Sequence, residues 1–355
     1  MLHFSNLSDA LVAGGCIRPI TLAKGLKLGS LSSKRVPVAL LLTVSGLVVE
    51  PFAWLQSLWY GRRIPACACP DNPVVVIGHW RSGTTYLHQL LAADPGAATA
   101  RNHFTIAPQA ALVLKPLLKP LLQRLMTQHR PIDAVPWGAE DPQEDEVGLA
   151  RFTMDTNMAG IAFPQNYPRH FRRAVLNSST EFEQRLLQFT RLTWLHEGPG
   201  KTHLVIKNSA HTARVALLLR LFPRARFVYL HRRPIDSIRS LVQVKQRLAQ
   251  LVGLQEPPSS LRQVEETVAV HDQLQEAFAR SRHLIPAGQL VEIAYDDLVL
   301  SPLDTLQRIY SALEIGGWSR ARDGIAARIA KGKAYQAQPV VLEPAAEQRL
   351  QALLS

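Results

Sequence analysis

The sequence predicts an α/β fold in which helices cover both faces of a central parallel β-sheet. The chain has 355 residues, of which 47% are hydrophobic and only 19% are charged, so it can bury a large core. Short β-branched runs alternate with segments of helical periodicity, which is the pattern of strands joined by crossover helices. Most of the apolar runs lack the polar alternation of a half-exposed sheet, and this favours strands buried on both faces.

Four apolar runs are the candidate strands. They are Val74 to Ile77, Leu204 to Ile206, Phe227 to Leu230 and Leu290 to Ile293. We expect these runs to form one parallel sheet at the centre of the core.

Three helices are predicted around these strands. Apolar residues at helical spacing predict a helix over 211–222, which a proline ends. A second helix is predicted to begin at Ser178, where Glu181 completes a capping box. A third is predicted from Ser301 to about Leu313, with proline at its first helical position.

The region of about 110–197 is predicted to hold helical cap insertions. Its first part, from Lys115 to Pro136, contains repeated prolines and basic residues. We interpret this stretch as a mobile cap rather than part of the core.

Residues 1–69 are predicted to form an apolar helical segment ahead of a catalytic domain over 70–355. Two apolar runs, at 36–49 and 52–60, are each shorter than the roughly 20 residues of a spanning helix. We expect a helix that is kinked or ends near Pro51. Two interpretations stay open: packing on the core, or peripheral membrane contact through 36–60, which Trp54 and Trp59 would suit.

Charge, leader and cysteine content limit the partners and the compartment. Forty Lys and Arg against twenty-eight Asp and Glu give a net charge of +12, which suits a phosphate or sulfate ester, nucleic acid or a membrane surface. Cys67 and Cys69 have the wrong spacing for a zinc knuckle, so no metal is expected. Residues 1–31 lack the pattern of a secretory signal, and we expect a cytoplasmic protein, either free or peripheral to the inner membrane.

The segment from Gly78 to Thr85, GHWRSGTT, is the most informative motif. It follows the first strand and precedes a helix, and its glycines have the spacing of a Walker A loop with Thr84 at the lysine position. Backbone N–H groups of Ser82, Gly83, Thr84 and Thr85 are expected to hold an anion at the helix N-terminus. Arg81 would supply a cation.

Two other classes of function remain as alternatives. A nucleotide phosphotransferase using ATP and Mg²⁺ would need Thr85 as a metal ligand, with Asp296 and Asp297 as the Walker B acids. A basic module could bind nucleic acid or anionic lipid. The most telling arginines follow apolar strands instead of forming a recognition helix, so we expect no nucleic-acid partner.

The motif RSGTT at Arg81 to Thr85 resembles that of sulfotransferases that use 3′-phosphoadenosine 5′-phosphosulfate (PAPS), in particular their bacterial branch. The resemblance implies a three-layer P-loop-like fold in which these residues bind the 5′-phosphosulfate. A second match follows the strand FVYL. It implies that Arg232 and Ser240 hold the 3′-phosphate.

Three further segments look like family segments and extend the resemblance to roughly 70–315. They are Lys207 to Arg214, Tyr295 to Leu298, and Pro142 to Glu146. The basic residues Lys331 and Lys333 are expected either to close over the nucleotide or to form an exposed tail.

The resemblance implies transfer of a sulfuryl group to a hydroxyl or amine, with release of adenosine 3′,5′-bisphosphate. Arg81 and Lys207 are predicted to stabilise the charge that builds in the transition state. The general base is the uncertain role: His103 is predicted because its segment has no carboxylate, and the alternatives are Glu144, Glu146 and His211. The acceptor can be a lipid, a carbohydrate or another small molecule, and the apolar N-terminal region slightly favours a lipid.

Overall fold

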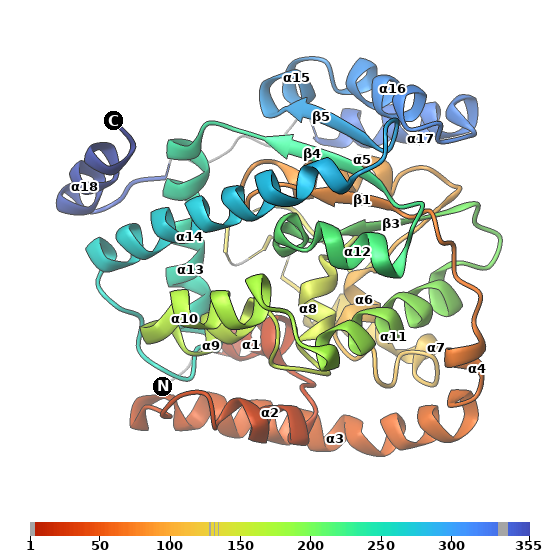
Figure 1. The fold of residues 1–355 in the computed structure, drawn as a ribbon. Coiled ribbons are helices and arrows are strands. Elements are labelled where there is room, and N and C mark those ends of the chain that lie inside the picture. The colour runs from red at the N-terminus through yellow and green to blue at the C-terminus, as the bar shows by residue number, and fades with distance from the viewer. Residues whose placement is uncertain (1–3, 128, 131, 134, 333–339) are drawn as a thin grey trace.

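A parallel sheet of five strands forms the centre of the molecule, as the computed structural model of the chain shows (Figure 1). The structure describes residues 4–127, 129, 130, 132, 133, 135–332 and 340–355. The strands are ordered β2-β3-β1-β4-β5, and every adjacent pair is parallel. Their bounds are β1 Val74–Ile77, β2 Ala97–Ala98, β3 His203–Lys207, β4 Arg226–His231 and β5 Leu290–Ala294. The predicted α/β fold with a central parallel sheet is confirmed.

The four predicted strands are all present, with two differences. Strand β2, which pairs with β3, was missed because two alanines carry no β-branched signal. Strand β5 is the other edge strand, and only Ile293 in it is buried while Glu292 is exposed. The expectation of burial on both faces is therefore wrong for β5, because an edge strand has a neighbour on one side only.

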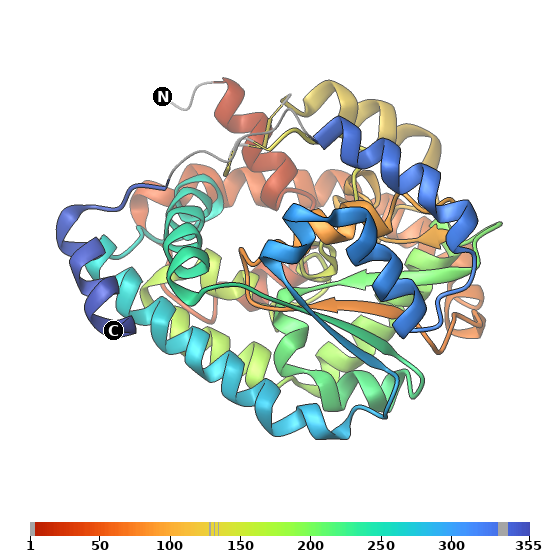
Figure 2. The same cartoon turned by 90° about the horizontal axis from the view of Figure 1, so that it is seen from above.

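Helices pack on both faces of this sheet and make three layers (Figures 1 and 2). On one face, Val74, Val76 and Val228 pack against α5 (Thr84–Leu91), α16 (Pro302–Ala312) and α17 (Trp318–Gly332). On the other face, Val75 and Ile77 belong to the cluster that includes α11 (Thr180–Glu197) and α12 (Val215–Leu221). Side chains of alternate residues in one strand thus enter opposite cores.

The predicted helix starts agree with the structure to within a few residues. Ser301 precedes α16 as expected. The N-cap of α11 is Ser179 rather than Ser178, and its hydroxyl accepts a hydrogen bond from the backbone N–H of Phe182 at 3.1 Å. The helix expected from 211 begins at Val215, because 209–213 form a short 3-10 turn.

The stretch from Lys115 to Pro136 is only partly a surface cap. It begins with α7 (Lys115–Leu125), whose Leu118 and Leu122 are buried in the core, while Leu117 and Leu121 are exposed. The chain then continues as a loop toward the carboxyl ends of the strands, and its residues Arg130 and Asp133 line a cavity there.

The remaining helices complete the cover. Their bounds are α4 Arg63–Ala66, α6 Asn102–Thr105, α8 Asp145–Leu149, α9 Met158–Ala162, α10 Tyr167–Phe171, α13 Pro234–Val252, α14 Ser260–Ser281, α15 Tyr295–Leu300 and α18 Pro344–Leu354. Short helical turns lie at 33–35, 164–166, 172–176 and 282–284. Figure 2 shows α18, close to the C-terminus, beside α13 and α14, with which it makes contacts.

The apolar N-terminal segment forms α1 (Phe4–Gly14), α2 (Pro19–Gly25) and α3 (Val36–Tyr60). Helix α3 is one helix of 25 residues that contains Pro51, so the expectation of a helix end near this proline is wrong. The preceding residue, Glu50, is held by Arg18, whose Nε lies 3.2 Å from its Oε2. Among the described residues, Ser33–Tyr60 is the one helical stretch long and apolar enough to cross a membrane, and a third of its most apolar window is buried.

Arg151 joins this segment to the body. Its guanidinium is fully buried and donates to the carbonyls of Ala13, Ile106 and Val147 over 3.2–3.4 Å. Burial lowers the pKa of Arg151 to about 10, so the group is still a cation at neutral pH. The Thr21 hydroxyl in α2 donates to the carbonyl of the same arginine at 3.2 Å.

Candidate functional site

A large cavity lies at the carboxyl ends of β1, β3 and β4. Its volume is about 1960 Å³, and it is lined by residues at or just after the ends of these strands, including Arg81, Lys207 and Arg232. The strand order reverses at β1, because β3 lies on one side of it and β4 on the other. Ligands of open α/β sheets bind at such a point. The volume exceeds the roughly 300–1,000 Å³ of a usual small-molecule pocket, so there is room for two ligands.

The loop between β1 and α5 has a backbone that only certain residues tolerate. Gly78 has φ +138° and Gly83 has φ +98°, and a Cβ at either would meet Leu230 O at 2.2 Å or the Tyr295 ring at 2.5 Å. The Gly78 N–H donates to the Thr212 hydroxyl at 2.8 Å, which ties the loop to the segment after β3. The two glycines therefore allow the loop to turn tightly and to approach Leu230 and Tyr295 closely.

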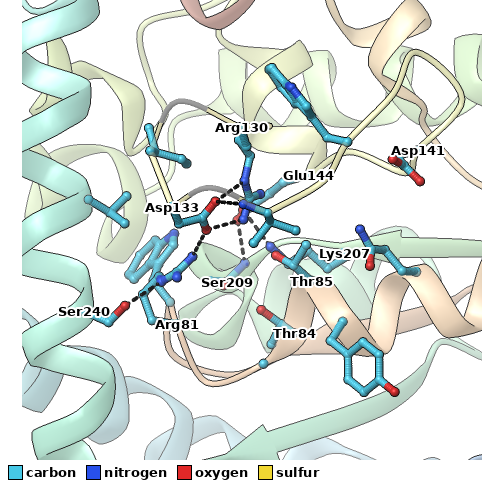
Figure 3. Close-up of a pocket in the computed structure, with 18 of the residues that line it drawn as sticks. Arg81, Thr84, Thr85, Arg130, Asp133, Asp141, Glu144, Lys207, Ser209 and Ser240 are labelled. Atoms are coloured by element: carbon cyan, nitrogen blue, oxygen red, sulfur yellow. Dashed lines mark hydrogen bonds and ion pairs between the residues drawn. The ribbon is translucent and has the colours of Figure 1, made fainter. Parts of the chain in front are cut away.

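Arg81 is the cation of this loop and is already engaged (Figure 3). Its Nε donates to the Ser240 hydroxyl at 2.9 Å, and its Nη1 lies 2.6 Å from Oδ2 of Asp133. Arg130 binds the same carboxylate, with its Nε 2.8 Å from Oδ1. Arg81 also has φ +68°, which is unusual for a residue with a side chain.

The carboxylate of Asp133 thus lies between two arginines at the phosphate loop. Burial acts to raise its pKa, but the hydrogen bond and charge of Arg130, joined by those of Arg81, outweigh burial and hold the pKa below its ordinary value. Asp133 is therefore ionised at neutral pH. The Asp133 carboxylate thus binds two arginines that could also bind the anionic group of a ligand.

Arg232 reaches the phosphate loop from the end of β4. Its Nη1 donates to the backbone carbonyl of Arg81 at 3.1 Å, and its guanidinium stacks 4.2 Å from the centre of the Tyr295 ring. The two residues predicted to hold the 3′-phosphate, Arg232 and Ser240, therefore both touch Arg81. Of the other predicted loop residues, Gly83, Thr84 and Thr85 line the cavity. Ser82 is buried, and its hydroxyl donates to His79 O at 2.7 Å.

Lys207, at the end of β3, faces the cavity next to a carboxylate (Figure 3). Its Nζ donates to Oε2 of Glu144 at 2.7 Å, and the N–H of Ser209 donates to Oε1 of the same glutamate at 2.9 Å. Lys207 is 5% exposed and Glu144 lies at the cavity wall. A cation and a carboxylate thus meet at the cavity beside the phosphate loop.

Glu146, only two residues further on, is in a different environment. Its oxygens accept hydrogen bonds from Arg214 at 3.0 Å, Asn208 at 2.6 Å and the N–H of Asn157 at 2.5 Å. Burial acts to raise its pKa, but the charge and hydrogen bonds of Arg214, together with the hydrogen bonds of Asn208 and Asn157, outweigh burial. The pKa therefore lies below its ordinary value. This carboxylate binds the segment after β3 to α8 and α9, a structural task. His211, fully buried, has Nε2 3.2 Å from Oδ2 of Asp145.

His103 lies apart from this group. Its Nδ1 is 2.9 Å from Ala139 O and its Nε2 is 3.2 Å from Oε1 of Glu197, so both ring nitrogens face acceptors. His196 Nδ1 approaches the same glutamate oxygen at 2.8 Å. His103 is buried, and it does not occur among the described residues that line the cavity. The structure therefore brings Arg81, Lys207 and Arg232 together but leaves His103 outside.

The other end of the cavity is apolar and is formed mainly by helices, with Trp80 from the loop between β1 and α5. We call it the apolar end; it consists of Val12 and Ala13 of α1, Trp80, Met158 and Ile161 of α9, and Leu248 and Leu251 of α13. We call the side with Arg81, Thr84, Lys207, Arg232 and Ser240 the phosphate-loop end. A second buried cation, Lys245, lines the cavity beside Tyr167, with its Nζ 3.5 Å from the centre of the ring.

Some functional candidates were missed in the sequence, and others lie elsewhere. Asp133 and Arg130 had no motif that marked their contacts, and Tyr295 was named only as part of a segment that resembles one of the family. The apolar end depends on packing between distant helices. Asp296 and Asp297 are exposed, and Asp297 pairs with Arg308 at 3.2 Å instead of facing the cavity. Lys331 lines the cavity, whereas Lys333 lies outside the described residues.

Comparison with known proteins gives a family match and curated relatives. A family model described as a sulfotransferase family matches residues 73–320. The omega-hydroxy-beta-dihydromenaquinone-9 sulfotransferase Stf3 of Mycobacterium bovis is 27% identical over 280 residues, which are 78% of this chain and 72% of the relative. Stf3 of Mycobacterium tuberculosis matches to the same extent.

Solved structures of sulfotransferases are also similar. STF1 from Mycobacterium tuberculosis H37Rv has a TM-score of 0.68 at 18% identity, over 99% of this chain and 94% of that chain. STF9 from Mycobacterium avium has a TM-score of 0.64 at 17% identity, over 89% of this chain and 80% of that chain. At these identities the likeness shows the shared fold.

Proposed function

This chain belongs to the sulfotransferase family and catalyses sulfuryl transfer, and from that premise we propose that it uses PAPS as donor and the hydroxyl of a lipid-like molecule as acceptor. The observation that carries the proposal is the two-ended cavity, which is cationic at the phosphate-loop end and hydrophobic at the apolar end. A nucleotide with three anionic groups suits the first end, and a long apolar molecule suits the second.

The donor would be held by the phosphate-loop end. Backbone N–H groups of Thr84 and Thr85 at the start of α5, with Arg81, suit the 5′-phosphosulfate. Arg232 and Ser240 suit the 3′-phosphate, because both adjoin Arg81. Asp133 must then leave Arg81 and Arg130, since its carboxylate and the donor compete for the same cations.

We assign the general base to Glu144 in preference to His103. Both glutamates line the cavity, but Glu144 is partly exposed beside Lys207, whereas Glu146 is buried and is held by Arg214 and Asn208. Glu144 takes the proton of the acceptor hydroxyl while the oxygen of that hydroxyl forms a bond to sulfur. Lys207 stabilises the charge left on the bridging oxygen as the bond from sulfur to that oxygen breaks, and adenosine 3′,5′-bisphosphate leaves.

A lipid-like acceptor is supported by two independent observations. The apolar end is lined by aliphatic side chains and Trp80, which favour apolar molecules over sugars. The relative Stf3 is named for a menaquinone derivative that carries a hydroxyl group. An isoprenoid or similar chain would lie in the apolar end with its hydroxyl toward Glu144.

A thermal-shift titration tests the donor, and a transfer assay tests the acceptor. Adenosine 3′,5′-bisphosphate should stabilise the protein more than ATP with Mg²⁺ does; stabilisation by ATP and Mg²⁺ alone would contradict the PAPS assignment. With radiolabelled PAPS, label should enter the organic phase of a bacterial lipid extract. Label found only on carbohydrate extracts would contradict the lipid-like acceptor.

A further inference from the structure

Helix α3 has two apolar faces, and only one of them is covered. The inner face, with Val38, Leu42, Val49 and Ala53, is buried against the body. The side chains of the opposite face are between 55% and 77% exposed. We call this the outer face of α3; it consists of Leu40, Val44, Leu47, Val48, Trp54, Leu58 and Trp59.

The outer face is too long and too apolar for an ordinary water-facing surface. Its residues recur at helical spacing from Leu40 to Trp59, a stretch of 20 residues that spans about 30 Å. Glu50 is the only charged residue between Val36 and Tyr60, and it is held by Arg18 at 3.2 Å. Contiguous exposed apolar patches of this kind mark a surface that binds a partner.

The neighbouring helix α2 extends the same surface. Helices α2 and α3 lie side by side along one edge of the molecule (Figure 1), and they are in contact. Ile20 of α2 is 59% exposed, and Leu26, directly after α2, is 40% exposed. Exposed apolar side chains therefore lie on or next to both helices along this edge (Figure 1).

The charges around this edge identify the partner. Lys34 precedes α3, and Arg62 and Arg63 follow it; all three are exposed, and within the described ranges no carboxylate pairs with them. Trp54 and Trp59 have the amphipathic rings found at membrane interfaces. We propose that α3 lies flat in the surface of a phospholipid bilayer that contains anionic headgroups.

The inner face explains why the helix lies on the bilayer instead of crossing it. Gln56 donates to Pro108 O at 3.0 Å and accepts from the N–H of Leu112 at 2.7 Å. A spanning helix would have to break these contacts and the pair between Arg18 and Glu50. A flat helix keeps all of them and exposes only the outer face to lipid.

Vesicle sedimentation of the full chain tests the proposal. The wild-type protein should sediment with vesicles of phosphatidylglycerol and phosphatidylcholine and much less with phosphatidylcholine alone. Leu47→Glu combined with Leu58→Glu should reduce the partition coefficient at least tenfold, since two side chains lose their lipid contact and gain charge. Leu284→Glu, at a residue that is 46% exposed outside this surface, is the matched control and should bind like wild type.

Fluorescence locates the contact. Brominated lipid should quench the wild-type tryptophan emission, and this quenching should be lost in Trp54→Phe with Trp59→Phe but kept in Trp318→Phe. The proposal is overturned if wild type stays in the supernatant with both kinds of vesicle, or if the Leu47→Glu and Leu58→Glu variant sediments like wild type. Wild type that dimerises through this face without binding vesicles, seen by sedimentation velocity, would instead identify a second copy as the partner.

The result is separable from the proposed function. Adenosine 3′,5′-bisphosphate binding, measured on the same variants, should be unchanged because α3 does not line the cavity. Variants that lose vesicle binding but keep bisphosphate binding show that the outer face of α3 acts in membrane binding and not in donor binding. A protein that binds vesicles but not the bisphosphate would contradict the donor site and leave the membrane proposal intact.

Discussion

The two ends of the cavity are built by different means. The phosphate-loop end consists of residues at or after the carboxyl ends of β1, β3 and β4, with Ser240 from α13, and charged hydrogen bonds such as Arg81 to Asp133 hold them. The apolar end consists of Trp80 and of side chains from α1, α9 and α13, which are distant in sequence and are held by packing. In the proposed function, the chemistry therefore depends on a few residues near strand ends, whereas acceptor choice depends on how whole helices pack.

The largest expected effect is that of replacing Glu144, the proposed base. Glu144→Gln keeps the shape of the side chain but removes the base, so the turnover number should fall roughly 10²- to 10⁴-fold. The dissociation constant of adenosine 3′,5′-bisphosphate should stay near that of wild type. Single-turnover kinetics with radiolabelled PAPS and calorimetric titration measure the two quantities.

Two control variants separate this role from structural ones. His103→Asn should lower the melting temperature, because Glu197 loses a partner, but should leave turnover within a few-fold. Glu146→Gln should also act on stability, since Arg214 would keep a neutral partner in a buried site. If His103→Asn abolished turnover in a folded protein, the base assignment would return to His103.

The next effect concerns the cation beside the apolar end. Burial lowers the pKa of Lys245 to about 7, although Glu266 acts in the opposite direction, and its Nζ has Thr267 Oγ1 at 3.1 Å. Lys245→Met removes the cost of burying the charge. We expect the free energy of unfolding to rise by about 2–4 kcal/mol at pH 6, measured by urea denaturation.

The pH dependence of that gain has a definite sign. The unfolded lysine titrates near its ordinary value of 10.5, so between pH 7 and 10.5 the unfolded chain binds more protons than the folded one. The wild-type stability therefore rises with pH in this window, and the advantage of Lys245→Met should shrink toward pH 10. Lys245→Arg keeps the charge and should be less stable than Lys245→Met at both pH values.

Substitution of Arg232 tests the proposed donor site, and substitution of the adjacent Arg233 is the control. Arg232→Ala should weaken adenosine 3′,5′-bisphosphate by about 1.5–3 kcal/mol, roughly 10- to 150-fold, because a charged hydrogen bond to the 3′-phosphate is lost. Arg233→Ala should leave the affinity unchanged, since its side chain is 78% exposed and pairs with Asp236. Equal effects of the two substitutions in a calorimetric titration would remove Arg232 from the site.

The smallest expected effect has the opposite direction. Asp133→Asn removes the internal anion from Arg81 and Arg130, so these cations become available to the donor. The affinity for adenosine 3′,5′-bisphosphate should rise by about 1 kcal/mol, a few-fold. Asp141→Asn, at another carboxylate of the cavity wall that does not bind Arg81, is the control. Weaker binding by Asp133→Asn would show that the carboxylate supports the donor site.

Much of the phosphate-loop end was predictable from the sequence. The strand at 74–77 and the glycines after it are local signals, and the structure has the strand at the same residues. Arg232 and Ser240 were predicted to share an anion, and both contact Arg81. Parallel strands bring their carboxyl ends together, so residues that directly follow strands can be assigned to one edge.

The remainder depended on contacts that no local pattern contains. Glu144 and Glu146 are equivalent in the sequence, and only the packing of α8 against the segment after β3 separates them. His103 was favoured by the nature of its side chain, but Glu197, 94 residues away, lies beside it. Pro51 suggested a helix end, yet tertiary packing on both sides of it keeps α3 continuous.

Arg151 also sets an order of events during synthesis. The Ala13 carbonyl bonds to Arg151, and the Thr21 hydroxyl bonds to the carbonyls of Arg151 and Phe152, about 90 residues beyond the end of α3. A ribosome that adds roughly 5–20 residues per second needs about 5–20 s for that interval. During this time α3 has been made, but Met154, Ala159 and Phe163, which belong to the same core cluster as Val38 and Leu42 of its inner face, have not. Until these residues emerge, α3 exposes apolar side chains on its inner face as well as on its outer face.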